Sequence, residues 1–351
     1  MPHDVSLLLP TRDRSDFVNR LLHYYHQLEF KGAILIGDSS GPLHSKKIKD
    51  TIRLFKDNLS IRYYEYPGFS NSECHQQLVD AVSTPYVAFL GDDDFLVPDA
   101  LKQCATFLNS HLDYVSAHGK AILFKVQSDS VHGQLENIGY YPQPIVESAT
   151  AAQRLMEHLR QGLVALFSVH RVDAWRLMFQ DAPSLSDVPL ATELLPSCLS
   201  VVLGKMNQLD CLYLARQVHQ QRYRHIDIFD RLMSENWAPS FRTFEACLSN
   251  EITRIDGVSI DEARAIIKRA FWDHLARVLM SRWKSHYVAS QRAAWQERMR
   301  RIPVALGIYQ WLRSWAGQDK FLLPTLLNSS SPYHADFMPI YQSITTISWR
   351  E

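Results

Sequence analysis

The feature that most constrains this chain is the alternation of strand-like and helix-like segments, four times within its first hundred residues. Short apolar runs predict strands at Val5–Leu9, Ala33–Gly37, Ile61–Tyr66 and Tyr86–Leu90. Between these runs, apolar residues recur at helical spacing, and polar or Pro- and Gly-containing turns separate the segments. Such alternation is typical of βαβ units. We therefore predict an α/β fold, with a largely parallel sheet and helices on both of its faces.

The predicted topology places several polar loops together. Right-handed crossovers bring the carboxyl ends of parallel strands to one edge of a sheet, where open α/β sheets bind their ligands. We expect Thr11–Arg14, Asp38 and Asp92–Asp94 to meet there, because each follows a predicted strand. Neither GxGxxG nor GxxxxGK[ST] follows any of these strands. Their absence argues against a dinucleotide oxidoreductase and a P-loop NTPase.

The three consecutive aspartates Asp92–Asp94 lie between the fourth predicted strand and a helix that Pro98 can open. Adjacent carboxylates repel one another, and a divalent cation would relieve that repulsion. Mg2+ or Mn2+ typically takes one or two carboxylates from the protein and completes its shell with substrate phosphates. A metal-bound diphosphate is therefore the expected ligand. The alternative is a solvated acidic turn, since aspartates near a helix N-terminus also suit the helix dipole.

The composition is that of a globular protein: of 351 residues, 46% are hydrophobic and 21% charged, with a formal net charge of zero. This balance does not suggest a nucleic-acid partner, which would require a basic surface. The five cysteines are widely spaced and form no CxxC pair, which favours a reducing compartment over a disulfide framework or zinc site. No secretory signal and no apolar run of about 20 residues is visible. We expect a cytoplasmic protein, with peripheral contact to the inner membrane left open.

The segments after residue 110 are expected to continue the same layers. Ser128–Pro144 is polar and punctuated by Gly and Pro, so it predicts a mobile loop beside the site. Asp187–Leu203 predicts an apolar helix whose one centrally placed acid is Glu193. The run Tyr114–Val126 predicts either two short strands or one strand bent at Gly119. The other expected elements are the strands Leu163–Val169 and Leu209–Val218 and the helix Val146–Arg160.

The composition changes after about residue 223, which predicts two domains, 1–223 and 224–351. Ser259 opens a capping box before a long helical pattern. From Arg277 to Trp315, basic residues and tryptophans interleave, with Glu297 as the only acid. Such a stretch can lie on an anionic membrane surface. The alternative is a helical subdomain with an aromatic core and a solvated basic face. This alternative is the commoner outcome, and we favour it.

Several motifs together point to a known family: LLPTRDR at 8–14, AILIGDSSG at 33–41, AVSTPYVAFLGDDDFLVPDAL at 81–101, Glu193 and RQVH at 216–219. With these motifs, residues 4–220 resemble a family 2-type glycosyltransferase of the GT-A fold. The resemblance is strongest before residue 110, and closest to a bacterial branch whose aspartate run ends in Phe. It implies a mixed, mainly parallel sheet flanked by helices. For residues 224–351, which lie beyond the resemblance, the helical pattern predicts a helical C-terminal domain that contacts the acceptor, a partner or a membrane surface.

The resemblance also implies roles for the donor-binding residues. The loop with Pro10, Thr11 and Arg14 would lie against the nucleotide, and Asp38 with Ser39 would contact the base and ribose. Gln76 stands near the position of an Asn-containing segment in relatives, which leaves that donor contact in doubt. Arg216 could clamp a phosphate bidentately, although a surface arginine is commoner.

The same resemblance implies a metal site. Asp94 would be the metal ligand, and Asp92 would lie nearer the ribose or a metal-bound water. Many relatives have Asp where Gly91 stands, and that register would favour Asp93 instead. His219 resembles a histidine that ligates the metal or the diphosphate in relatives, although a lone histidine is more often structural.

Such an enzyme would move a sugar from a nucleotide-diphosphate donor, with a UDP-sugar expected, to a hydroxyl of a glycan or lipid-linked acceptor. Because a metal-bound diphosphate needs no protein acid to leave, one carboxylate base suffices, and inversion would follow. Glu193 is the first candidate for that base and Asp187 the second, with a salt-bridge partner as the alternative for Glu193. The competing functions are a sugar nucleotidyltransferase and a catalytically silent scaffold or glycan-binding protein.

Overall fold

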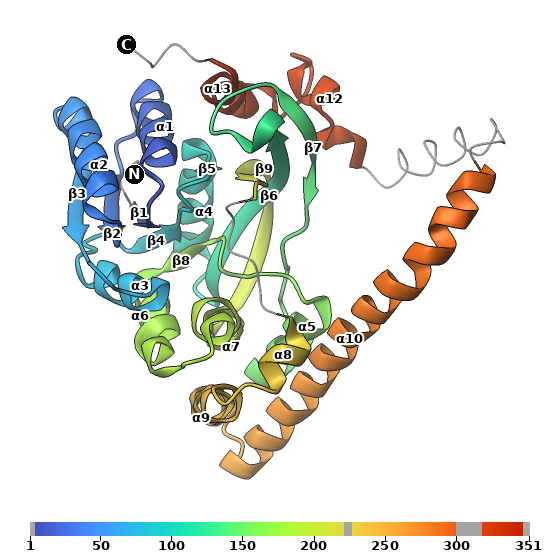
Figure 1. Ribbon diagram of the computed structural model, residues 1–351. Coiled ribbons are helices and arrows are strands. Elements are labelled where there is room, and N and C mark those ends of the chain that lie inside the picture. The colour runs from blue at the N-terminus through green and yellow to red at the C-terminus, as the bar shows by residue number, and fades with distance from the viewer. Residues whose placement is uncertain (1–3, 221–226, 300–317, 347–351) are drawn as a thin grey trace.

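The computed structural model describes residues 4–220, 227–299 and 318–346 (Figure 1). Their strands form one nine-stranded sheet in the order β3-β2-β1-β4-β8-β6-β9-β5, and β7 pairs with β6. β1, β2, β3 and β4 pair in parallel, as do β6 and β9, whereas β5, β7 and β8 run antiparallel to their neighbours. The strands are β1 (Val5–Thr11), β2 (Ala33–Asp38), β3 (Ser60–Glu65), β4 (Tyr86–Phe89), β5 (Asp94–Leu96), β6 (Tyr114–Val126), β7 (Leu135–Tyr141), β8 (Val169–Arg171) and β9 (Lys205–Gln217). The predicted mixed, mainly parallel sheet is confirmed.

Alternate residues of the central strands point to opposite faces of the sheet, and both faces are buried. In β1, Leu7 and Leu9 belong to one hydrophobic cluster, whereas Leu8 belongs to a second. All three side chains are fully buried. This explains why the strand sequences are apolar throughout and do not alternate with polar residues, as expected for a sheet covered on both sides.

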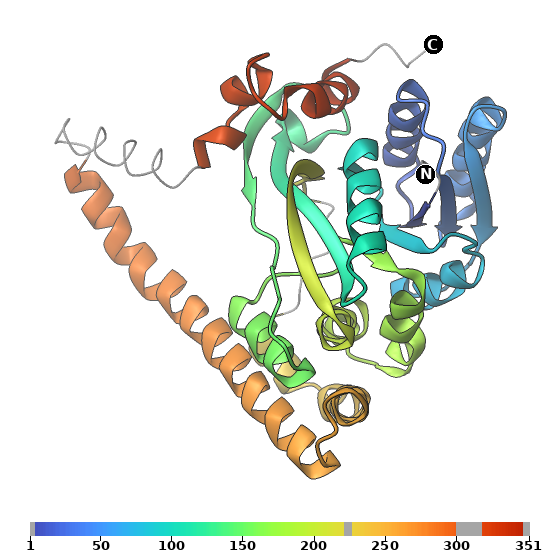
Figure 2. The same cartoon turned by 180° about the vertical axis from the view of Figure 1, so that it is seen from behind.

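Helices cover each face. The first cluster holds buried side chains of α1 (Ser15–Gln27), α2 (Pro42–Phe55), α4 (Pro98–Ser110), α12 (Leu323–Leu327) and α13 (His334–Thr345). The second holds those of α3 (Asn71–Asp80), α5 (Ala151–Gln161), α6 (Val172–Gln180), α7 (Leu195–Leu203), α9 (Trp237–Asp256) and α10 (Ile260–Met299). The short helix α8 (Ile228–Leu232) precedes α9, and α10 runs along the outside of the molecule (Figures 1 and 2).

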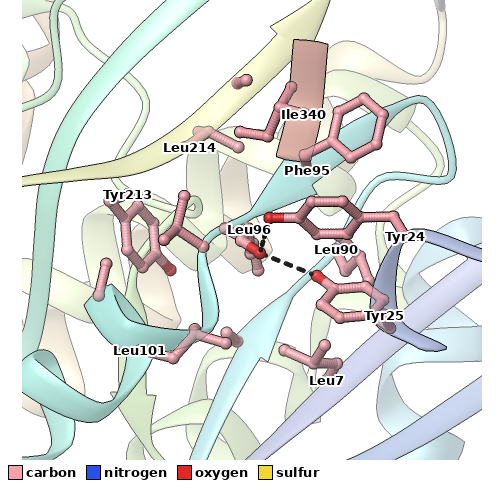
Figure 3. Close-up of a cluster of buried hydrophobic side chains, with 14 of the residues drawn as sticks. Leu7, Tyr24, Tyr25, Leu90, Phe95, Leu96, Leu101, Tyr213, Leu214 and Ile340 are labelled. Atoms are coloured by element: carbon pink, nitrogen blue, oxygen red, sulfur yellow. Dashed lines mark hydrogen bonds between the residues drawn. The ribbon is translucent and has the colours of Figure 1, made fainter. Parts of the chain in front are cut away.

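The first cluster fixes the strand that follows the aspartates (Figure 3). The hydroxyls of Tyr24 and Tyr25 donate to the carbonyl of Leu96, at 3.4 and 3.3 Å, so helix α1 bonds directly to β5. Phe95 packs against Tyr24 with ring centroids 5.0 Å apart. Large buried side chains of this kind each stabilise the fold by roughly 1.5–3 kcal/mol. The backbone just after Asp94 is therefore rigidly held.

Four predicted elements differ from the structure. The expected helix Val146–Arg160 begins only at Ala151, because Val146 instead forms a β-bridge with Met206. In the expected strand Leu163–Val169, only Val169 belongs to a strand, because the chain turns at Ser168, whose N–H donates to the Leu166 carbonyl. The expected loop Ser128–Pro144 contains β7, which pairs with β6. The expected helix Asp187–Leu203 begins with a π-helical turn over Leu190–Leu194. Pro196, which follows it, has no N–H to donate to the carbonyl four residues earlier, and this favours an irregular turn there.

The chain after residue 227 packs on both faces of the same sheet. Helices α9 and α10 bury Phe244, Leu248, Ile267 and Phe271 in the second cluster, and α13 buries Phe337 in the first. The predicted boundary at residue 223 lies outside the described residues, as do residues 300–315 of the basic, Trp-containing stretch Arg277–Trp315. The division into two domains stays a prediction. None of the described helices combines the length and apolar content that crossing a membrane requires.

Candidate functional site

A cavity of about 800 Å3 opens at the carboxyl ends of β1, β2 and β4. Its wall includes several residues that the sequence singles out. These are Pro10, Thr11, Arg14, Ser39, Asp92, Asp93, Glu193 and Arg216. They come from segments up to about two hundred residues apart, so the predicted convergence of strand-end loops is confirmed. Other wall residues had no role assigned from the sequence, among them Phe69, Tyr141 and Val188.

The side chains of Asp92 and Asp93 meet at one arginine. Nη1 of Arg14 donates to Oδ1 of Asp92 at 2.9 Å and to Oδ2 of Asp93 at 3.1 Å. The Thr11 hydroxyl donates to Oδ2 of Asp92 at 2.8 Å. Burial and the neighbouring Asp93 carboxylate raise the pKa of Asp92 to about 6, against the opposing effect of Arg14. The PTRDR loop therefore contacts the aspartates directly as well as lining the cavity.

His219 and Arg216 contact the rest of the triplet. Nε2 of the buried His219 lies 2.8 Å from Oδ2 of Asp93, and Nε of Arg216 donates to Oδ2 of Asp94 at 3.1 Å. Burial opposes ionisation of Asp93, but the hydrogen bond from His219 and the charge of Arg14 outweigh it and lower the pKa of Asp93. Two arginines and a histidine thus face three carboxylates. The mutual repulsion of the three carboxylates is therefore offset within the protein and does not by itself require a metal ion.

Asp94 differs from its two neighbours in position. It is the first residue of β5, its exposed fraction is 2%, and it does not line the cavity. The sequence had placed Asp94 in a strand-end loop, as the most suitable metal ligand. In the structure, Asp92 and Asp93 are the two members of the triplet that line the cavity.

Arg20 is a buried arginine that was not predicted from the sequence, and it holds the backbone of the triplet. Nη2 of Arg20 donates to the Asp93 carbonyl at 3.1 Å, and its Nη1 donates at 2.6 Å to both Gln217 Oε1 and the Val131 carbonyl. Burial lowers the pKa of Arg20 to about 10. Arg20 shares the apolar face of its helix with Phe17 and Tyr24, and a charge at such a position was the available signal.

Asp38 is buried at the end of β2 but does not line the cavity. The Tyr63 hydroxyl donates to its Oδ2 at 2.6 Å, and the Ser40 N–H donates to its Oδ1 at 2.8 Å. Burial, and then this hydrogen bond to Asp38, raise the pKa of Tyr63. Asp38 therefore shapes the loop that carries Ser39 into the cavity wall, and its contact with a base or ribose stays a prediction.

An aromatic stack flanks this loop. The rings of Tyr64 and Tyr66 lie 5.9 Å apart at an angle of 5°, and those of Tyr66 and Phe69 lie 5.1 Å apart at 8°. Phe69 lines the cavity. The sequence analysis read these tyrosines only as part of a strand. Three nearly parallel rings beside a cavity offer a flat apolar surface of the kind on which planar ligands stack.

The two candidate bases lie in different surroundings. Glu193, in the π-helical turn, is partly buried and lines the cavity. Asp187 does not line it. Its Oδ1 accepts the Leu190 N–H at 2.9 Å, and both of its carboxylate oxygens accept hydrogen bonds from Arg231, at 2.7 and 3.2 Å. The geometry assigns Asp187 to holding the turn that carries Glu193.

Gln76 also lies away from the cavity. Its side-chain amide is exposed and donates to the Gln180 carbonyl at 2.9 Å. This amide ties helix α3 to the end of α6. A donor contact by Gln76 stays a prediction that the geometry does not favour.

The carboxylates of the cavity wall fit a metal ion that enters already bound to a diphosphate. Among the described residues, no three His, Cys, Asp or Glu side chains converge as a metal centre. A metal ion bound to a diphosphate needs only one or two carboxylates from the protein. Asp92 and Asp93 present carboxylates at the cavity wall. They suit such an incoming ion, whereas the described residues hold no preformed cage.

The sequence matches no family model and no curated protein. The structure is similar to that of S. aureus TarS residues 1–349, with 12% identity, a TM-score of 0.50, and coverage of 78% of this chain and 72% of that one. Against a longer S. aureus TarS structure the identity is 13% and the TM-score 0.48, and this chain spans only 43% of that chain. A mannosyltransferase from Pyrobaculum calidifontis, in complex with GDP-Man and Mn2+, gives 8% identity and a TM-score of 0.40, covering 83% of this chain and 82% of that one. At such identities the likeness concerns the fold, and it agrees with the predicted fold class.

Proposed function

We propose that this protein is a glycosyltransferase that moves a sugar from a nucleotide-diphosphate donor, a UDP-sugar, to an acceptor hydroxyl of a glycan or lipid-linked molecule. One observation carries the proposal. Thr11 and Arg14 from one loop, and Asp92, Glu193 and Arg216 from three other segments, line one cavity of about 800 Å3. That volume lies within the roughly 300–1,000 Å3 typical of small-molecule sites. The fold likeness to TarS adds support, because the same TarS fragment has been solved with UDP and with UDP-GlcNAc.

The nucleotide would lie along the β1 and β2 ends of the cavity. Pro10, Thr11, Ser39 and Phe69 line the cavity, and the base would stack on the ring of Phe69. The guanidinium groups of Arg14 and Arg216 line the same cavity. Such groups bind phosphate oxygens with parallel N–H donors, so the diphosphate would lie between these two arginines.

Asp92 and Asp93 would hold a Mg2+ or Mn2+ ion that accompanies the donor. Such an ion, when bound, neutralises charge on the departing diphosphate. Arg216 remains paired with Asp94 in β5 and β9, which fixes its guanidinium at the cavity wall. His219 and Arg14 keep Asp93 ionised and therefore able to bind a cation.

Glu193 would act as the general base. Its carboxylate would take the proton of the acceptor hydroxyl as the hydroxyl oxygen bonds to the anomeric carbon. The bond from that carbon to the diphosphate oxygen would break on the opposite face, and its electron pair would leave with the diphosphate. Configuration at the anomeric carbon would therefore invert. Glu193 lies in the same cavity wall as Arg216, as this geometry requires.

Nucleotide binding tests the proposal. The full chain is heated with UDP, GDP, CMP or TDP, each with and without Mn2+. We expect one nucleoside diphosphate to bind the folded state preferentially and so raise the melting temperature. At a concentration 100 times Kd, such binding adds about 2.7 kcal/mol to the free energy of unfolding. Arg216→Gln should abolish the shift, whereas Gln76→Ala should retain it, because Gln76 lies away from the cavity. A chain that responds to none of these nucleotides would overturn the proposal in favour of a silent scaffold.

A further inference from the structure

Helix α10 has an unusual outward face. Its inner face is formed by Ala263, Ile267, Phe271 and Leu275, which are buried against α9 and α5. A helix packed on one side normally presents polar residues on the other. Here the opposite side carries Trp272, Ala276, Leu279 and Trp283, which we call the outer stripe. The exposed fractions of the three large side chains are 62%, 47% and 58%, and Ala276 is also exposed.

The outer stripe is a continuous line along the helix. Its members lie 4, 7 and 11 residues after Trp272 in the sequence. At about 100° per residue these offsets place all four within an arc of about 60°. Met280, with an exposed fraction of 53%, lies beside them. Phe229 of α8 and Met233, which directly follows α8, are exposed as well, at 65% and 72%. An ion pair between Asp227 and Arg282 joins the start of α8 to α10.

Basic side chains border the stripe. Residues 264–284 contain six Lys and Arg residues and a single acid, Asp273, which pairs with Arg160. Lys268 and Arg269 lie one turn before Trp272, and Lys284 follows Trp283. In the part of the chain that the structure describes, these three make no ion pair. The chain as a whole has a formal net charge of zero, so this basic segment is a local concentration of charge.

We propose that the outer stripe of α10 docks on an anionic membrane surface. Tryptophans favour the interface between headgroups and acyl chains, and lysine and arginine side chains reach from there to anionic headgroups. A second copy of this chain is the less suitable occupant, because pairing two such helices would bring two basic segments together. This proposal does not depend on the proposed function, since no member of the stripe lines the donor cavity.

Cosedimentation of the full chain with vesicles tests the proposal. We expect binding to vesicles of equal parts phosphatidylcholine and phosphatidylglycerol, little binding to phosphatidylcholine alone, and release as the ionic strength approaches about 0.5 M. Lys268→Gln with Arg269→Gln should lower the partition coefficient by roughly fivefold per charge, about twenty-five-fold together. Trp272→Ser with Trp283→Ser should lower it by about tenfold or more, since it removes the apolar anchor.

A matched control comes from helix α2, where Leu43 and Leu54 are as exposed as the stripe tryptophans, at 68% and 70%. Leu43→Ser with Leu54→Ser should leave vesicle binding unchanged. No binding to anionic vesicles, or binding that the stripe variants do not weaken, would overturn the proposal. Sedimentation as a dimer that Trp272→Ser with Trp283→Ser dissociates, without vesicle binding, would instead favour a second copy. Nucleotide-induced thermal shifts measured on the same variants show whether the donor site is intact, independently of vesicle binding.

Discussion

Asp94 and Arg216 are register partners on β5 and β9, and their side chains are joined by a bond of 3.1 Å between Arg216 Nε and Asp94 Oδ2. The Asp94 side chain has an exposed fraction of 2% and the Arg216 side chain 14%. Burial opposes the charge on Arg216, yet the carboxylates of Asp94 and Asp93 together with Tyr141 outweigh it and raise the pKa of Arg216. This pair is therefore part of the interior and holds a cavity-lining arginine in place.

Asp94→Asn should destabilise the protein. Removing one partner of a buried ion pair leaves the other charge buried and uncompensated, which typically costs about 3–5 kcal/mol. Urea unfolding monitored by circular dichroism measures the loss. Asp99→Asn is the control, because Asp99 pairs with Lys102 at an exposed site and should change stability by less than about 1 kcal/mol. Equal stability of the two variants would contradict a structural role for Asp94.

Glu193→Gln should separate binding from chemistry. The amide keeps the shape of the side chain but cannot accept the acceptor's proton, so turnover should fall by about 100-fold or more while nucleotide binding persists. Sugar transfer and nucleotide-induced thermal shift are measured on the same preparation. Asp187→Asn provides the contrast, because it loses the bidentate pair with Arg231 and should mainly lower stability. Unchanged turnover in Glu193→Gln would move the base elsewhere.

Phe69→Ala should weaken nucleotide binding. The Phe69 ring lines the cavity and continues the stack of Tyr64 and Tyr66. Stacking of a base on an aromatic ring is worth about 1–3 kcal/mol, which corresponds to a roughly 5- to 150-fold rise in Kd. Isothermal titration with the nucleotide that stabilises the protein measures this change. If Phe69→Ala bound as tightly as Gln76→Ala, the base would have to lie elsewhere in the cavity.

His75→Leu should flatten the acid sensitivity of folding. His75 is fully buried among Phe89, Trp175 and Phe179, and burial lowers its pKa to about 3. In the unfolded chain, the His75 imidazole binds a proton at about pH 6.5. The contribution of neutral His75 to the free energy of unfolding is therefore fully present above that pH and is lost as the pH falls towards 3. The loss from this residue is about 3 kcal/mol at pH 4.

Unfolding free energies at several pH values between 7 and 4.5 check this prediction. The wild-type protein should lose stability steeply, since burial also lowers the pKa of His170 to about 3 and that of His158 to about 4. The leucine variant should show a slope smaller by about one proton, or roughly 1.4 kcal/mol per pH unit below pH 6. Parallel curves for the two proteins would mean that His75 is protonated in the folded state.

Much of the fold and part of the site could be predicted from the sequence. The first four strands and the meeting of their loops follow from apolar runs and from the handedness of crossovers, and both are local rules. The predicted strand Leu163–Val169 failed because a short apolar run also suits a buried irregular segment. The strand β7 was missed because its sequence, Leu135–Tyr141, mixes polar and apolar residues at the sheet edge.

What the sequence by itself determined is which groups line the cavity: the loop with Thr11 and Arg14, and Asp92 with Asp93. Only the tertiary structure decided how their charges pair. The residues that contact the triplet are Arg14, Arg216 and His219, which are 78, 122 and 126 positions away from their partners in the sequence. No local sequence pattern predicts a partner at such a distance. The physical reason is that strand and helix formation depends on neighbours a few residues away. The charge state of a buried carboxylate depends instead on whichever side chains the completed fold packs around it.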